Sequence, residues 1–404
     1  MNVALSDERP ASRRLASNMR ALLLLWLAGV SLRLTILALP PVLNAVTAEF
    51  RLRGTDLGIL TALPPLLFAL AAVPGAALIG RFGAVPSLLA GLLITAFGAA
   101  ARGFSGNVVA LELATAVMCF GVAIMQPALP SLVRTWTPAR VGLATATYTC
   151  GLLCGEVLPV LWPFAPDLPM IGAGWRGVLF QWSLPVLATA VVTAVFRPRA
   201  HQARRPSVAR LWPNWRSTSI WPIALLLGAV NASYFGLNGF LPGWLSQSGR
   251  SDLIRSALLT LNVAQIPASL LLMVFIERLV FRRASYVVAG FAMLAGSVGL
   301  VMAPPTFAVA FAALAGFSMA WLLTLALALP PLLVDAEEVA SLSAAVFTVS
   351  YGIAVITALA TGLLQTIGVS RSTSILPIAA SALVVIVTGT MIRRASARKA
   401  AATP

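Results

Sequence analysis

Apolar runs of about twenty residues recur from one end of the chain to the other, and they limit the folds that it can adopt. An α-helix needs about 20 apolar residues to cross the hydrocarbon core of a bilayer. We predict twelve such spans, at about 20–44, 55–79, 85–103, 108–132, 140–163, 175–196, 219–245, 254–276, 285–303, 306–333, 340–364 and 374–392. The sequence therefore predicts an all-α polytopic membrane protein.

Composition and charge agree with this fold class. Of the 404 residues, 59% are hydrophobic and only 10% are charged, whereas about a quarter of the residues in a soluble domain are charged. The net charge of +16 would suggest a nucleic-acid partner in a soluble protein. Basic loops also orient membrane proteins, so we expect membrane lipids, and no nucleic acid, around this chain.

A basic segment, RPRAHQARRPSVARLWPNWRST, is the one long polar stretch and separates six spans from six spans. The two halves also repeat each other, because LPPVL ends the first span, LPGWL ends the seventh, and Pro41 thereby matches Pro242. Parallel repeats of this kind enclose a substrate site near the bilayer midplane. The predicted parts are an N-terminal tail (1–19), a six-helix half (20–196), a basic linker (197–218), a second six-helix half (219–392) and a basic C-terminal tail (393–404).

The distribution of basic residues predicts the orientation. Most of the 28 lysines and arginines fall in the two tails, the linker and the loops on the same side as these segments. Arg102 is one of the few that we expect in loops on the opposite side. Because cytoplasmic loops carry the excess of basic residues, both termini are predicted to be cytoplasmic in a bacterial-type inner membrane.

The loop after the second span carries a recognisable motif. GAALIGRFGA is similar to the Gly-x-x-x-Asp-Arg-x-Gly-Arg-Arg signature of the major facilitator superfamily, with Arg81 and Gly83 matching. Gly80 stands where that signature has an acidic residue, and Ala84 where it has a basic one. The resemblance implies twelve transmembrane helices in two six-helix halves, with the loop at Arg81 and Gly83 acting as a conformational gate.

Longer stretches resemble the cyanate/nitroimidazole porter (CynX/NimT) family of that superfamily. They are SLRLTILALPPVL, GVAIMQPALPSLVRTWTPARVGLATATYTCGLLCG, GWRGVLFQWSLP and YFGLNGFLPGWL. This resemblance implies a secondary transporter of a small anionic or electronegative solute.

Arg33 lies near the middle of the first span, where a charged side chain is costly and faces a cavity or a partner. One interpretation is structural, with Arg33 paired to Glu156 or to backbone carbonyls. The other is functional: a guanidinium stays charged and offers a planar fork of donors to an anionic or electronegative group. We favour an Arg33 that binds the solute.

Two carboxylates lie within predicted spans. Glu156 belongs to the outer half of the fifth span, and its proton affinity depends on burial and on pairing with Arg33. It is our candidate for proton coupling, with a plain structural ion pair as the alternative. Glu112 lies one turn from the end of the fourth span, where a solvated role at the membrane interface is the better interpretation.

Further polar or aromatic residues are candidates for the wall of the binding site. Asn231, Tyr234 and Asn238 share one face of the seventh span through their spacings of three and four. Hydrogen bonding between helices is the alternative role for such residues, and core packing is the alternative for a mid-span tryptophan. The other candidates are Gln126 in the fourth span, Trp321 in the tenth, and, with weaker support, Asn262 and Gln265 in the eighth.

Other kinds of function find little support in the sequence. There is no Gly-Lys-Ser/Thr phosphate loop to indicate ATP drive, and one histidine, His201, rules out a Ser/His/Asp set built in a span. The three cysteines do not form a pattern of metal ligands. We therefore expect a monomeric transporter that is not an enzyme and has no cofactor or metal. The alternatives are a multidrug exporter of the same superfamily and a non-transporting receptor or lipid scramblase.

Overall fold

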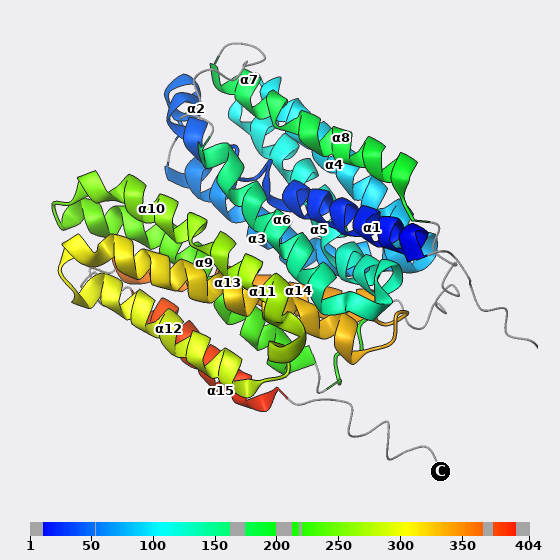
Figure 1. Cartoon of the computed structure of the whole chain (residues 1–404). Coiled ribbons are helices and arrows are strands. Elements are labelled where there is room, and N and C mark those ends of the chain that lie inside the picture. The colour runs from blue at the N-terminus through cyan, green and yellow to red at the C-terminus, as the bar shows by residue number, and fades with distance from the viewer. Residues whose placement is uncertain are drawn as a thin grey trace, which may run out of the picture.

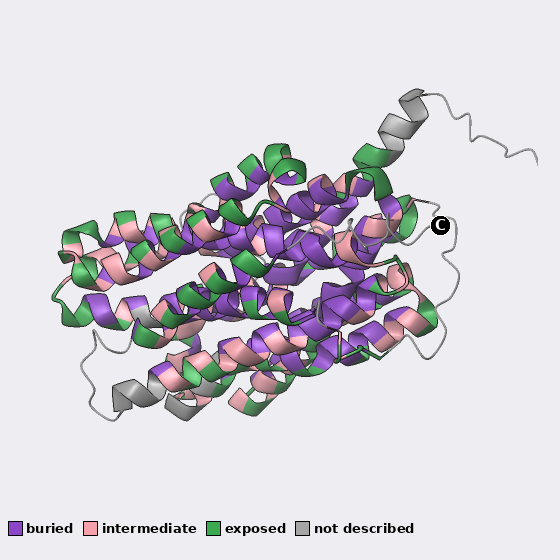
Figure 2. Ribbon diagram, turned by 90° about the horizontal axis from the view of Figure 1, so that it is seen from below, coloured by how far each residue is buried: buried purple, intermediate pink, exposed green. Residues whose placement is uncertain are grey.

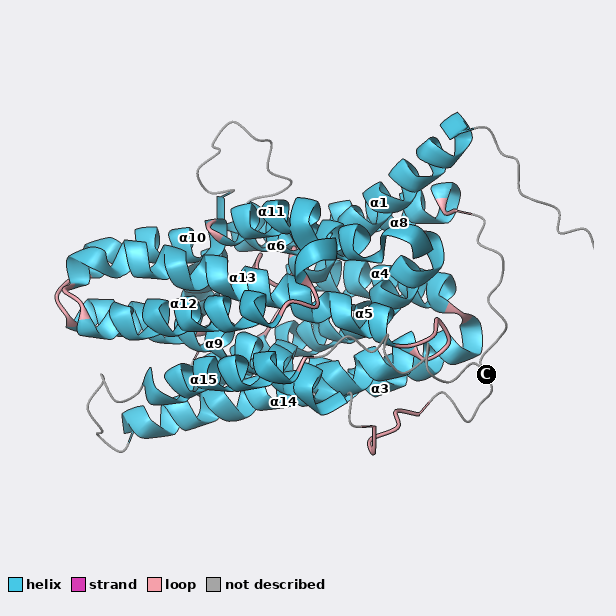
Figure 3. Ribbon diagram, turned by 60° about the horizontal axis from the view of Figure 1, so that its bottom comes forward, coloured by secondary structure: helices cyan, strands magenta, loops and turns pink. Residues whose placement is uncertain are grey.

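The computed structural model describes residues 11–52, 54–161, 174–198, 212–217, 220–366 and 375–392. Within these residues, every regular element is a helix (Figure 3). A helix satisfies all its backbone hydrogen bonds internally, which hydrocarbon surroundings demand. Ten of the described helical segments are long and apolar enough to cross a membrane, and the predicted all-α membrane fold is confirmed.

The helices form two groups that follow the order of the chain (Figure 1). The first group contains α1 (Ala11–Arg33), α2 (Leu43–Phe50), α3 (Gly54–Phe82), α4 (Ala84–Gly103), α5 (Val108–Trp136), α6 (Val141–Leu161), α7 (Gly174–Gln181) and α8 (Ser183–Phe196). The second contains α9 (Ile220–Gln247), α10 (Ile254–Val263), α11 (Gln265–Leu279), α12 (Arg283–Met302), α13 (Ala308–Leu333), α14 (Val339–Thr366) and α15 (Leu376–Met391). Short 3₁₀ turns precede several of them, such as η1 (Pro40–Val42).

The two halves meet mainly along two helix pairs. The most extensive contacts between them join α3 to α14 and α6 to α11. Both pairs combine one helix from each half, so any rearrangement of the halves must change the packing of these four helices.

The outer surface of the bundle is apolar. Figure 2 shows buried residues along the inner faces of the helices and exposed ones on their outer faces. Phe97, Val274 and Leu359 are 73%, 72% and 68% exposed. Apolar exposure on this scale is rare in soluble monomers, but it is what contact with lipid tails requires.

Three of the predicted spans differ in detail from continuous helices. The first breaks after Arg33, and regular structure resumes only in η1 at Pro40. The eighth breaks at Ala264, between α10 and α11, and the sixth at Trp182, between α7 and α8. A broken helix in a membrane is tolerated where it lines a cavity or is buried in protein.

Parts of the predicted tails and linker lie outside the described residues. These parts are residues 1–10, most of the linker (199–211 and 218–219) and 393–404. The domain boundaries therefore stay predictions, and His201 lies outside the described residues.

Candidate functional site

Arg33 is the last residue of α1, and the backbone unwinds immediately after it. Residues 34–38 form turns and Leu39 a bend before η1 begins. The Arg33 carbonyl accepts hydrogen bonds from the N–H groups of both Ile36 (3.1 Å) and Leu37 (3.0 Å). The guanidinium thus stands at the end of a helix and beside irregular backbone, an arrangement that transporters use in their binding sites.

Close packing of α1 on α6 brings Arg33 opposite Glu156. Gly151 and Gly155 of α6 lie so close to α1 that a Cβ atom would collide with the carbonyls of Trp26 and Val30. Small residues allow two backbones to approach in this way. Since Glu156 follows Gly155 directly, the same contact sets its position relative to Arg33.

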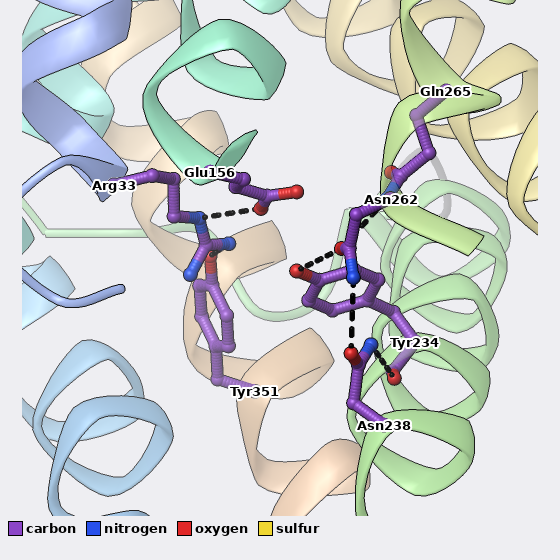
Figure 4. Close-up of polar contacts among 7 residues, drawn as sticks. All are labelled: Arg33, Glu156, Tyr234, Asn238, Asn262, Gln265 and Tyr351. Atoms are coloured by element: carbon purple, nitrogen blue, oxygen red, sulfur yellow. Dashed lines mark hydrogen bonds and ion pairs between the residues drawn. The ribbon is translucent and has the colours of Figure 1, made fainter. Parts of the chain in front are cut away.

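Arg33 has polar partners in both halves of the protein (Figure 4). Its Nε lies 3.3 Å from Glu156 Oε1, and the two side chains are only 5% and 3% exposed. Its Nη2 donates a 3.1 Å hydrogen bond to the hydroxyl of Tyr351 in α14. The buried ion pair that the sequence left open is therefore present, and a tyrosine from the second half joins it.

Aromatic rings enclose the guanidinium. The rings of Phe68 in α3 and Phe235 in α9 have their centroids 5.7 Å from Arg33 Cζ. The Tyr351 ring meets Phe68 edge-on at 5.0 Å and stacks on Phe347 at 6.2 Å. Such ring contacts stabilise a desolvated cation, and here they come from both halves.

A small cavity adjoins Arg33. Its volume is about 20 Å³, which is room for about one water molecule and too little for an organic solute. An organic solute could bind at Arg33 only if the surrounding side chains or helices moved apart. The cavity is lined by Leu32, Arg33, Gln126, Tyr148, Leu152, Leu227, Asn231, Leu323, Leu327, Phe347 and Tyr351.

Three buried polar atoms of this region have no hydrogen-bond partner in the described chain. They are Gln126 Oε1, the Tyr148 hydroxyl oxygen and Glu156 Oε2. Buried polar groups are normally hydrogen-bonded, and exceptions call for an explanation. In Figure 4 the free oxygen of Glu156 points away from Arg33, toward the side where Tyr234 and Asn262 lie. Gln126 Oε1 and Glu156 Oε2 can accept hydrogen bonds from water or a bound solute, and the Tyr148 hydroxyl can also donate one. Glu156 Oε2 can in addition take up a proton.

A second polar cluster faces this one from the other half (Figure 4). Asn262 Oδ1 accepts hydrogen bonds from the Tyr234 hydroxyl (3.1 Å) and from Gln265 Nε2 (3.2 Å). Asn262 Nδ2 donates to Asn238 Oδ1 (3.3 Å). The cluster joins α9 to the break between α10 and α11, so Asn262 and Gln265 are as central to it as Tyr234 and Asn238.

The remaining predicted wall residues divide into two groups. Asn231 lines the cavity and donates to Ser350 Oγ (3.4 Å), while Gln126 lines it from α5. Trp321 lies outside the cavity lining, where its Nε1 donates to Ser285 Oγ (2.9 Å) and its ring stacks on Phe317. These contacts correspond to the packing role that the sequence left open for a mid-span tryptophan.

The loop with Arg81 and Gly83 lies at one end of the bundle, away from the cavity. Gly83 is the single residue between α3 and α4, and its φ of +93° favours glycine. Arg81 is exposed and its guanidinium lies over the Phe82 ring at 5.4 Å. At the same end, Glu277 of α11 accepts a hydrogen bond (3.4 Å) from the N–H of Leu143 in the first turn of α6.

Three residues near the site were not among the candidates predicted from the sequence. Tyr148 and Tyr351 line the cavity, and they lie about 200 residues apart, the offset of the internal repeat. Because the chain has only four tyrosines, two of them at the repeat offset could have been chosen as site candidates from the sequence. Arg102, expected in a loop, is 1% exposed. That expectation is wrong, because its side chain turns inward to a backbone carbonyl of the broken first span.

Known proteins resemble the chain in sequence and in fold. Residues 22–359 match the family described as the Major Facilitator Superfamily. The chain is 29% identical to the 2-nitroimidazole transporter of Escherichia coli (strain K12) over 292 residues, 72% of this chain and 73% of that protein. It is 24% identical to the cyanate transport protein CynX of the same strain over 302 residues, 74% and 77% of the two chains. The proton:xylose symporter XylE, solved with 6-bromo-6-deoxy-D-glucose, shares the fold with a TM-score of 0.76 and 12% identity over 94% of this chain and 97% of that one.

Proposed function

Because the chain belongs to the Major Facilitator Superfamily, we propose that it is a secondary active transporter of a small anionic or electronegative organic solute, with Arg33 as the group that binds it. The observation that carries the proposal is a guanidinium, buried between the two halves, that lines the cavity and contacts both halves. A guanidinium donates two parallel hydrogen bonds to a planar anion or nitro group.

The charge balance supports an anionic or electron-rich solute. Among the described residues, the buried charged side chains are Arg33, Arg102 and Glu156. One positive charge is therefore left without a buried carboxylate. A lipophilic cation, the solute expected of a multidrug exporter, would meet repulsion here. The printed names of the two E. coli relatives, for 2-nitroimidazole and cyanate, fit the same chemistry.

Alternating access supplies the transport step in this proposal. The cavity at Arg33 is too small for an organic solute, so the two halves would have to move relative to each other before one could bind. Arg33 contacts Tyr351 and Phe235 of the second half, and a solute bound at Arg33 would replace some of these contacts. Solute occupancy would thereby alter the contacts that hold the halves together.

Glu156 is the proposed proton carrier. It shares Arg33 with any anionic solute, and its Oε2 has no hydrogen-bond partner in the described chain. Protonation of Glu156 would weaken the ion pair and free the guanidinium for the solute. In this scheme a proton and an anion bind together, which avoids adding a net charge to a buried site.

The proposal extends to the setting of the protein. We propose that it is a monomer in a bacterial-type inner membrane with both termini cytoplasmic; the basic tails and linker support this orientation. A cysteine at position 204 should then be labelled by an impermeant thiol reagent only after the cells are opened. Labelling in intact cells would reverse the orientation.

Uptake into proteoliposomes tests the function. Purified protein should take up radiolabelled cyanate or 2-nitroimidazole, and the rate should rise when the lumen is alkaline relative to the outside. Arg33→Ala should abolish uptake. Transport of lipophilic cations by the parent, with neither anion nor nitroimidazole accepted, would instead support the multidrug exporter. Absence of any solute-dependent thermal stabilisation would support a receptor or scramblase.

A further inference from the structure

Arg102 lies at the far end of α4 and behaves unlike an arginine at a membrane boundary. Long basic side chains near helix ends usually extend to the interface and keep their charge in water. Arg102 instead turns into the protein and is among the largest fully buried side chains. Among the described residues, no carboxylate forms an ion pair with it.

The buried guanidinium reaches the break in the first span. Arg102 Nη1 donates a 2.7 Å hydrogen bond to the carbonyl of Thr35 and approaches Met118 Sδ at 3.2 Å. Thr35 is two residues beyond Arg33, inside the unwound segment 34–39. The N–H of Leu39, which would bond the Thr35 carbonyl in a continuous helix, bonds Ile36 instead.

A carbonyl exposed by a break in a membrane helix needs another donor, because no lipid supplies one. Arg102 is the donor that the described structure provides. We propose that Arg102 is a positioning residue: it holds the unwound segment 34–39 and so fixes the direction in which Arg33 leaves the end of α1. The expected effect of Arg102 on solute binding rests on the proposed function. Its expected effect on the conformation of segment 34–39 does not.

A cation is better suited to this task than an amide would be. A charged donor makes a stronger hydrogen bond to a carbonyl than a neutral one. It also adds positive charge near Arg33, which favours an anionic solute. A lysine at this position would retain both properties with a less rigid side chain, whereas glutamine would retain neither the charge nor the reach.

Hydrogen exchange tests the positioning directly. Purified parent, Arg102→Gln and Arg102→Lys proteins would be compared by mass spectrometry, with peptides that cover residues 34–39. Arg102→Gln should speed exchange in this segment by about tenfold, the equivalent of one lost hydrogen bond, and Arg102→Lys should stay within about threefold of the parent. Unchanged exchange in Arg102→Gln would overturn the proposal. If Arg102→Gln does not fold, exchange in Arg102→Lys as fast as in an unstructured peptide would overturn it.

Arg176→Gln is a matched control. Arg176 lies in α7 at the same end of the same half and also donates to a backbone carbonyl, that of Ser105 (3.1 Å). Its ion pair is with Glu49 of α2 (2.7 Å) and not with residues 34–39. This change should leave exchange in residues 34–39 as in the parent. Equal acceleration in both variants would indicate general loosening of this end of the protein and would overturn a specific role of Arg102.

Solute affinity provides the second measurement, with cyanate and 2-nitroimidazole as probes. Arg102→Gln should weaken probe binding by about tenfold in the parent and by clearly less in an Arg33→Lys background, since coupled residues are not additive. Additive losses would overturn the claim that Arg102 acts through Arg33. If the parent binds neither probe, the proposed solute class is wrong, while the exchange data still decide whether Arg102 holds the segment.

Discussion

Arg33 and Tyr351 are 318 positions apart in the sequence, yet the arginine Nη2 and the tyrosine hydroxyl are hydrogen-bonded at 3.1 Å. Arg33 ends α1 in the first half, and Tyr351 belongs to α14 in the second. The contact joins the halves beside the cavity that Arg33 lines. A ligand that engages Arg33 therefore acts on a contact between the halves.

Replacing Arg33 with lysine should weaken solute binding while leaving the fold intact. Lysine keeps the positive charge but loses the planar fork, and a lost charge-assisted hydrogen bond costs about 1–3 kcal/mol. Thermal-shift titration of purified protein with cyanate and 2-nitroimidazole measures the change. Arg33→Lys and Arg33→Ala proteins that fold and transport like the parent would show that Arg33 does not bind the solute.

Glu156→Gln separates proton coupling from scaffolding. A proton carrier is needed for pH-driven accumulation but not for counterflow exchange, so this variant should lose the first and keep the second. If Glu156 only neutralises Arg33, breaking the buried pair should cost about 3–5 kcal/mol, and Arg33→Gln added to Glu156→Gln should restore the melting temperature. Normal proton-driven uptake by Glu156→Gln would exclude both roles.

Gly155→Ala tests the close approach of α1 and α6. The added Cβ would collide with the Val30 carbonyl, and overpacking of this kind costs about 1–3 kcal/mol. We expect a lower melting temperature and weaker probe binding, because Arg33 and Glu156 move apart. Gly243→Ala in α9, where an added Cβ meets nothing within 4 Å, should lower neither quantity, since alanine favours a helix more than glycine does. An equal loss there would make the effect non-specific.

Glu277 should hold the two halves together at the end of the bundle where α11 ends. Its carboxylate accepts from the Leu143 N–H in the first turn of α6, and a negative charge near a helix N-terminus contributes about 0.3–1 kcal/mol. Glu277→Gln should therefore lengthen the distance between spin labels at positions 140 and 278 in a larger share of molecules. Glu112→Gln, in the first turns of α5, is the control; equal distance distributions in parent and Glu277→Gln would contradict the prediction.

Glu49 should make the stability of the protein depend on pH. It lies in α2, at the end of the first half opposite to the loop with Arg81. Its Oε2 accepts hydrogen bonds from Trp175 Nε1 (2.7 Å) and Arg176 Nη1 (2.9 Å), and these bonds hold the pKa of Glu49 below its usual value of 4.5. Because the folded state favours the carboxylate, the stabilisation is complete above the unfolded pKa and is lost as the pH falls through the lowered one. The melting temperature of the parent should approach that of Glu49→Gln as the pH drops below 4.5. A constant difference at acid pH would refute this link.

The sequence was sufficient to identify Arg33 as a candidate site residue, because a charge in the middle of a membrane span is costly whatever surrounds it. Glu156 could be identified for the same reason, and an ion pair between the two residues could be proposed. Whether that ion pair forms could not be predicted from the sequence. It depends on the contact of Gly151 and Gly155 with α1, which brings two helices together that are distant in the chain.

Arg102 shows where local reasoning about charge fails. At the end of a span, an arginine can reach water or turn inward, and both are compatible with the local sequence. The inward choice follows from the break after Arg33, which exposes the Thr35 carbonyl within reach of α4. The position of Arg102 in the sequence could not predict that its side chain turns inward.

The sequence by itself determined that this protein is a bundle of membrane helices in two repeated halves with an arginine at its centre. The length of an apolar run and the cost of burying a charge are properties of short segments, so both can be evaluated without knowledge of the fold. Only the tertiary structure decided that Arg33 meets Glu156, Tyr351 and two phenylalanine rings, that Trp321 packs elsewhere, and that Arg102 supports the broken span. Those outcomes depend on which face each helix turns toward its neighbours, and that is set by the packing of all helices together.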